Sequence, residues 1–166
     1  MVTYISSICA LICCGMDKKV PNNYILLGVF TSCVSYLVGC SCALVSDKMI
    51  VLEAAALTGA MTLAITVYAI TTKTDFTVCG PVLFIMGFIF AMAGILFSFT
   101  RSNNVIFAAI GVFLFSFYLL VDTQMIIGGS NRSYKIDEDS YILASVALYL
   151  DIINIFLYIL RILNSK

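Results

Sequence analysis

The sequence predicts an all-α fold, a polytopic helical bundle that lies in a membrane. Hydrophobic residues make up 62% of the 166 residues and charged residues only 11%, whereas soluble domains are about 45–50% apolar and about 25% charged. Apolar runs recur along the chain, and short polar turns separate them. Nine acidic and nine basic residues give a net charge of zero without a basic block. Charge patterning therefore gives no indication of a nucleic-acid partner, and the partner we expect is the lipid bilayer.

Six hydrophobic segments are expected within one domain, 1–166, since a helix needs about 20 apolar residues to cross a bilayer. The first is too short to cross alone and has the pattern of the later half of a helix. Pro21, which suits the first turn of a helix, precedes the second segment. The turns are short, so consecutive helices should pack as antiparallel neighbours. The predicted segments are about 1–14, 24–46, 49–72, 78–100, 105–127 and 141–160.

The last two segments carry one aspartate each, Asp122 and Asp151. A carboxylate inside hydrocarbon costs about 2.5–3.5 kcal/mol on insertion scales, so both side chains should face protein, water or each other. With a rise of 1.5 Å per residue, they lie roughly 9 Å and 15 Å from the loop that the two helices share. Antiparallel neighbours with a modest stagger would bring the two carboxyl groups within hydrogen-bonding reach.

Two carboxyl groups at that separation are expected to share a proton and to titrate as a unit. One proton allows a hydrogen bond between them, whereas a second negative charge pushes them apart. The sequence therefore predicts a pH-sensing latch between the last two helices, which could gate a pore. The alternative is that each aspartate only hydrogen-bonds to a neighbouring helix and stabilises the bundle.

Four further polar residues are candidates for the lining of a pore or polar seam. Thr123 and Gln124 directly follow the first aspartate, and Asn154 lies on the same helical face as the second. Glu53 lies near the end of its segment, where we expect it to reach interfacial water or to pair with Lys48. The candidates are Glu53, Asn154, Thr123 and Gln124.

The residue inventory indicates no bound cofactor. Histidine, the commonest metal ligand and the commonest general base near neutral pH, is absent. The seven cysteines form neither a paired CxxC nor a zinc-binding spacing, so we expect them to pack at helix interfaces. The acidic run at 137–139 lacks EF-hand spacing and is expected to cap the sixth helix. We therefore expect no cofactor and no firm metal site.

An enzyme is not expected either. Intramembrane aspartyl proteases also use two carboxyl groups that share a proton to activate water, and they resemble one another in carrying Tyr-Asp and Gly-x-Gly-Asp motifs. Here Leu120-Val121 and Tyr149-Leu150 precede the two aspartates, so both motifs are missing. A proton-coupled transporter is disfavoured because no internal repeat and no pair of broken helices marks a substrate site.

Five stretches together resemble the transmembrane BAX inhibitor motif family, and within it the Golgi anti-apoptotic and Lifeguard branches. The resemblance covers nearly the whole chain in order, and the DTQ and LYLDIIN motifs are specific. The stretches are NYILLGVFT (Asn23–Thr31), VLEAAALT (Val51–Thr58), TKTDFT (Thr72–Thr77), VDTQ (Val121–Gln124) and YILASVALYLDIINIFLYILRIL (Tyr141–Leu163).

The resemblance implies a bundle of seven hydrophobic segments in Golgi or endoplasmic reticulum membranes. Compared with the family, we expect the first span to be missing here and the chain to be a six-segment form. The resemblance also implies inhibition of apoptosis through a calcium leak out of stores. The family's paired aspartates match Asp122 and Asp151, beside which the permeant calcium would pass.

The alternative function is a non-conducting membrane protein that binds other family members or apoptosis regulators through its helices. Ion flux through the purified protein would separate this function from the calcium leak.

Overall fold

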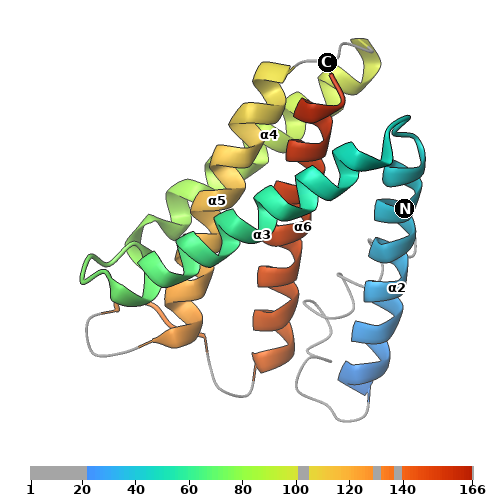
Figure 1. Ribbon diagram of the computed structural model, residues 1–166. Coiled ribbons are helices and arrows are strands. Elements are labelled where there is room, and N and C mark those ends of the chain that lie inside the picture. The colour runs from blue at the N-terminus through green and yellow to red at the C-terminus, as the bar shows by residue number, and fades with distance from the viewer. Residues whose placement is uncertain (1–21, 101–104, 129–131, 137–139, 166) are drawn as a thin grey trace.

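The computed structural model describes residues 22–100, 105–128, 132–136 and 140–165, and these residues form a helical bundle (Figure 1). Five long α-helices and one short 3₁₀ helix make up its regular structure, and no strand occurs within the described ranges. The predicted all-α class is confirmed. The elements are α2 (Asn22–Ala43), α3 (Lys48–Thr71), η2 (Thr77–Cys79), α4 (Gly80–Thr100), α5 (Val105–Ile127) and α6 (Tyr141–Leu163).

Each of the five α-helices contributes a stretch that is long and apolar enough to cross a bilayer. Together they confirm the predicted polytopic membrane protein. The predicted first segment, 1–14, lies outside the described residues, so five of the six predicted segments are seen.

The turn between α2 and α3 begins earlier than expected. α2 ends at Ala43 rather than at 46, because the chain turns inward and buries Val45 against the bundle. Asp47 then caps α3, since its Oδ1 accepts a hydrogen bond from the Met49 N–H at 2.9 Å. At the other end of the chain, α6 continues to Leu163 rather than 160, because Leu163 still packs on the same core.

α6 is the central helix of the bundle (Figure 1). It packs against α5 as an antiparallel neighbour, against α2 on its other side, and against α3, which crosses α5 and α6 obliquely. α4 contacts α5 and lies at the outside. The main core cluster joins α3, α5 and α6, and its buried members include Ala54, Leu119 and Ile155. The aspartates predicted to meet therefore lie on the two helices with the most extensive contact.

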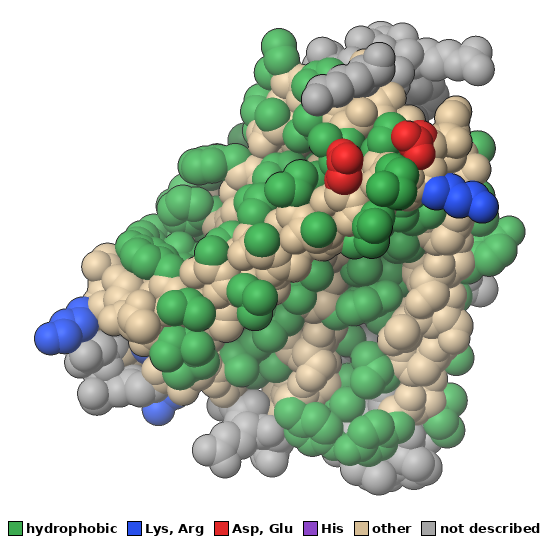
Figure 2. Space-filling model, viewed as in Figure 1, with side chains coloured by type: hydrophobic (Ala, Val, Ile, Leu, Met, Phe, Trp, Pro, Cys, Tyr) green, Lys and Arg blue, Asp and Glu red, His purple; other side chains and the backbone are tan. Residues whose placement is uncertain are grey.

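The outer surface is apolar. Figure 2 shows hydrophobic side chains spread over the visible face, with few charged ones among them. On α4, the side chains of Phe84, Phe88 and Ile89 are all more than half exposed. Large exposed apolar surfaces are rare on soluble monomers, so this surface is the one that faces lipid.

Candidate functional site

The two intramembrane aspartates meet between α5 and α6. Asp151 is 5% exposed, and Asp122 is half-buried. Their carboxyl groups lie close enough for a hydrogen bond between them. An ionised carboxylate has only acceptors, so such a bond requires a proton on one of the two groups. The Oδ2 atom of Asp151 is buried and has no hydrogen-bond partner among the described residues. A buried polar atom of this kind is costly unless a proton or a donor reaches it.

Tyr118 lies one helical turn before Asp122 and interacts electrostatically with both carboxyl groups. Its hydroxyl donates a hydrogen bond to the Leu83 carbonyl of α4 at 2.6 Å. A Cβ on residue 87 would collide with this hydroxyl. Gly87, which has no Cβ, therefore allows the Tyr118 hydroxyl to approach α4 closely. Tyr118 was not predicted as a site residue, although its i, i+4 spacing from an intramembrane aspartate is a signal that could have found it.

Gln124 binds the end of α3 and the segment that follows it. Its side chain is fully buried. The Oε1 atom accepts a hydrogen bond from the Phe76 N–H at 2.9 Å. The Nε2 atom donates to the Thr74 carbonyl at 3.1 Å and to the Ala69 carbonyl at 3.5 Å. Both halves of the amide are therefore bound to backbone groups from a different part of the chain.

Arg132, in the loop after α5, binds the same backbone segment. Its guanidinium donates to the Ala69 carbonyl at 3.1 Å, to the Thr72 carbonyl at 2.9 Å and to the Thr74 carbonyl. The last carbonyls of a helix carry partial negative charge and lack partners within the helix. A guanidinium placed over them therefore caps the C-terminal end of α3.

Asp75 completes the link between the two loops. Its Oδ1 accepts hydrogen bonds from the N–H and hydroxyl of Thr77 at 3.0 and 2.6 Å. Its Oδ2 accepts from the N–H and hydroxyl of Ser133 at 2.8 and 2.7 Å. These bonds stabilise the carboxylate and hold the pKa of Asp75 well below its usual range. We call Asp75, Gln124, Arg132 and Ser133 the loop clasp.

Only Gln124 of the loop clasp was predicted as a site residue. The other three are ordinary turn residues in sequence. The sequence offers little signal for them, because Asp75 and Arg132 lie in turns that also carry Lys73 and Lys135. Their contacts depend on which loops share a membrane face.

Within the described residues, no hydrogen bond joins the other predicted lining residues to the aspartate pair. The Thr123 hydroxyl donates to the carbonyl four residues earlier in α5 at 2.6 Å. The Asn154 amide donates to the carbonyl four residues earlier in α6 at 2.8 Å. Glu53 is exposed on α3, and no ion pair joins it to Lys48 in the described part of the chain. The role of Glu53, Asn154 and Thr123 as pore or seam lining therefore stays a prediction.

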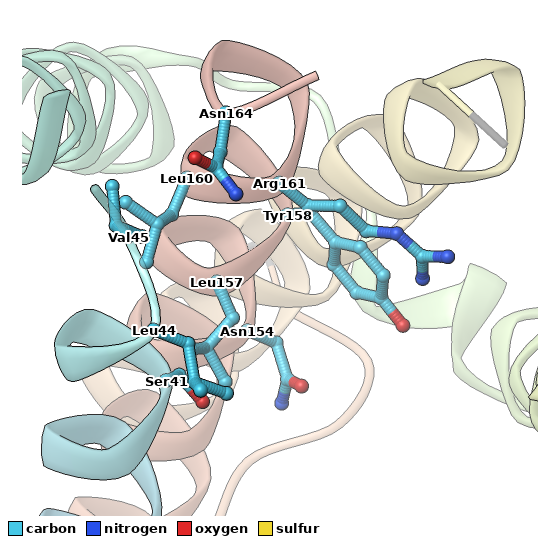
Figure 3. Close-up of a pocket in the computed structure, with 9 residues that line it drawn as sticks. All are labelled: Ser41, Leu44, Val45, Asn154, Leu157, Tyr158, Leu160, Arg161 and Asn164. Carbon is cyan, nitrogen blue, oxygen red and sulfur yellow. The ribbon is translucent and has the colours of Figure 1, made fainter. Parts of the chain in front are cut away.

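Asn154 instead faces a pocket of about 400 Å³ between the end of α2 and the C-terminal half of α6 (Figure 3). Apolar side chains from the α2–α3 turn and from α6 form much of its wall. The described lining residues are Ser41, Leu44, Val45, Asn154, Leu157, Tyr158, Leu160, Arg161 and Asn164.

The whole chain matches one known protein family. The family described as "Inhibitor of apoptosis-promoting Bax1", Bax1-I, matches residues 1–166. The chain belongs to the Bax1-I family. This membership confirms the resemblance drawn from the sequence motifs.

Named relatives of this Bax1-I protein carry the Lifeguard name. Protein LIFEGUARD 4 of Arabidopsis thaliana is 41% identical over 154 residues, which cover 89% of this chain and 60% of that protein. Protein lifeguard 3 of Mus musculus is 28% identical over 172 residues, which cover 100% of this chain and 54% of the relative. The chain thus spans somewhat more than half the length of these relatives.

Two of the stretches that carry the Bax1-I resemblance meet in space. The TKTDFT stretch contains Asp75 and Phe76, and the VDTQ stretch contains Asp122 and Gln124. The hydrogen bond from the Phe76 N–H to Gln124 joins the two stretches directly. These two stretches therefore lie in one region, at the end of the bundle where α3 and α5 finish.

Acidic side chains do not gather into a metal centre in the part of the chain that the structure describes. There, no group of three or more His, Cys, Asp or Glu side chains could hold an ion. The predicted passage of calcium near the aspartate pair therefore stays a prediction about a permeant ion and not about a resident metal. The acidic run at 137–139 lies outside the described residues.

Proposed function

We propose that this chain inhibits apoptosis as a pH-sensitive calcium leak channel in a Golgi or endoplasmic reticulum membrane, with the Asp122–Asp151 pair as its latch. The observation that carries the proposal is the direct contact between two carboxyl groups inside an apolar bundle. An ionisable group at membrane depth is expensive and is a functional-site candidate by default. Two that meet across the α5–α6 contact support a function that depends on their protonation.

The latch works through the proton that the pair shares. While one carboxyl is protonated, it donates to the other and ties α5 to α6. When the proton leaves, two like charges remain at close range and repel each other. Tyr118 is a further ionisable side chain that interacts with both carboxyls, and its hydrogen bond to α4 would couple the latch to that helix.

A calcium leak would favour cell survival by lowering the calcium content of the store. A channel that lowers store calcium leaves less calcium for release during a death signal, which limits overload of mitochondria. The relatives and the family description support the anti-apoptotic part. In this proposal calcium is the permeant ion, no cofactor is bound, no enzymatic step occurs, and other family members or apoptosis regulators are the protein partners.

The test is calcium efflux from liposomes that contain the purified 166-residue chain, followed from about pH 6 to pH 8. We expect efflux that varies with pH in the parent chain. The Asp122→Asn and Asp151→Asn variants should lose most of that variation, because an amide holds the hydrogen bond but does not titrate in this range. Asp47→Asn is the matched control, since asparagine caps a helix about as well as aspartate.

Efflux that varies with pH equally in all four proteins would remove the latch from the proposal. If folded protein gave no efflux at any pH, the channel itself would be refuted for this chain. The non-conducting interaction protein would then become the better explanation of its family membership.

A further inference from the structure

We propose that the loop clasp is a positioning device for Asp122: it ties the last turns of α5 to the end of α3 and so holds this aspartate against Asp151. The inference rests on the proposed function, in which the aspartate pair is the latch. It assigns a role to Asp75, Arg132 and Ser133, which lie outside the apolar interior. Within the described residues, their hydrogen bonds go to neither Asp122 nor Asp151.

The helical period sets the directions in which Asp122 and Gln124 project from α5. Residues two positions apart on an α-helix project about 200° apart, because each residue turns the helix by about 100°. Asp122 and Gln124 are two positions apart and therefore point to nearly opposite sides. Asp122 contacts α6, and Gln124 contacts the end of α3. One turn of α5 is thus held from both sides.

A rotation or shift of α5 would disturb the contacts of Asp122 and Gln124 together. Any movement that withdraws Asp122 from Asp151 also moves Gln124, which is fully buried. The Phe76 N–H would then lose its partner, and the buried Gln124 amide would lose its bonds to the backbone. Buried donors and acceptors left without partners are costly. The clasp therefore opposes opening of the aspartate pair.

The loop after α5 supplies a second attachment to the end of α3. Arg132 donates to the Ala69 and Thr74 carbonyls that Gln124 also binds, and Ser133 binds Asp75. The Ile136 N–H donates to the Met125 carbonyl at 3.0 Å, which folds this loop back onto the end of α5. The loop and the helix therefore hold the end of α3 jointly, so loosening the loop should weaken the grip on α5.

The test uses the full chain and two variants in the loop, because replacing the fully buried Gln124 would disturb the fold itself. Arg132→Gln removes the guanidinium, and Ser133→Ala removes one donor to Asp75. Lys135→Gln is the matched control. Lys135 lies in the same loop and is exposed, and its replacement removes one positive charge, as Arg132→Gln does. Two readouts are followed, namely calcium efflux against pH and amide hydrogen exchange over residues 119–125.

We expect Arg132→Gln to speed exchange over residues 119–125 roughly tenfold, about the effect of one charge-assisted hydrogen bond, and Ser133→Ala to do so by a smaller factor. Lys135→Gln should match the parent. Efflux should rise in the same order at the pH where the parent is slowest, with a flatter pH profile. A change in general stability alone would not flatten that profile.

Unchanged exchange over residues 119–125 in both loop variants would overturn the inference, whatever the efflux. Faster exchange with an unaltered efflux profile in a parent that conducts would also overturn it, because the clasp would then not act on the latch. If the parent does not conduct, the proposed function fails, and the exchange readout still decides whether the clasp holds the Asp122 turn.

Discussion

At the scale of single residues, neighbours on one turn of α5 have different partners. Asp122 meets Asp151 of α6, Thr123 binds its own helix, and Gln124 binds the end of α3. Hydropathy alone treats all three as polar interruptions of one apolar run. Their separate roles follow from the 100° step between helical residues together with the positions of the neighbouring helices.

The carboxylate of Asp75 should make the stability of the folded state depend on pH in acid. Its pKa is held below the usual 3.8 by hydrogen bonds from Thr77 and Ser133, so this carboxylate stabilises the folded state above about pH 4 and stops doing so as pH falls through the lowered native pKa. Ser133→Ala should raise the pKa of Asp75 toward 3.8, as followed by the side-chain carboxyl ¹³C shift. A titration curve identical to that of the parent would show that Ser133 does not stabilise the carboxylate.

Gly111 gives a prediction about packing. A Cβ on this glycine would lie 2.8 Å from Cδ2 of the Tyr158 ring on α6. Overpacking of this kind costs about 1–3 kcal/mol. Gly111→Ala should therefore lower the thermal unfolding midpoint in detergent. Gly59→Ala on α3 is the matched control, since nothing lies within 4 Å of a Cβ there, and its midpoint should not fall. Equal midpoints for the two variants would contradict this close α5–α6 contact.

At the scale of elements, α4 is attached to the bundle mainly through α5. The Phe90 and Phe107 rings stack with their centroids 4.2 Å apart and their planes 1° from parallel. The Tyr118 hydroxyl supplies a polar contact to the Leu83 carbonyl. Much of the rest of α4 faces outward. These contacts therefore carry a large part of the attachment of this helix.

Tyr118→Phe tests that attachment. The variant keeps the ring but loses the hydrogen bond to α4, which should cost about 0.5–1.5 kcal/mol. We expect faster amide exchange in α4 around residue 83 and a small drop in the unfolding midpoint. Tyr36→Phe on α2 removes a hydroxyl from a side chain that is 74% exposed, and should change neither value. An α4 exchange rate equal to that of the parent would show that the hydrogen bond does not hold the helix.

At the scale of the whole molecule, the sequence predicted the class and the spans well. A run of about 20 apolar residues between polar turns is long enough for a helix that crosses the bilayer and satisfies its own backbone groups. The ends were less exact where tertiary contacts decide them, as when burial of Val45 ends α2 early. Helix periodicity cannot show such an inward turn, because Val45 lies in an unbroken apolar run.

The candidate site was predictable in part. Two aspartates on consecutive apolar helices stand out because a carboxylate is costly in hydrocarbon. The loop clasp was not predictable, since Asp75 and Arg132 lie far apart in sequence and in polar turns where charges are common. Their meeting depends on how α3 crosses the bundle, and that crossing is set by side-chain packing along three helices.

The order of the helices determines which loops lie on the same face of the membrane. α3 ends beside the loop that follows α5, as the contacts of Arg132 with the end of α3 require. Lys73 and Lys135 must therefore lie on one face of the membrane, and Lys48, at the start of α3, on the other. All three side chains are exposed.

An amine reagent that cannot cross the membrane should label the unmodified protein in sealed, uniformly oriented vesicles accordingly. We expect Lys73 and Lys135 to react together and Lys48 to stay unlabelled, or the reverse in vesicles of opposite orientation, as read by mass spectrometry of peptides. Detergent should make all three reactive, which controls for local shielding. Joint labelling of Lys48 and Lys135 in sealed vesicles would mean that α3 does not cross the bilayer, and the loop clasp could not then form as seen.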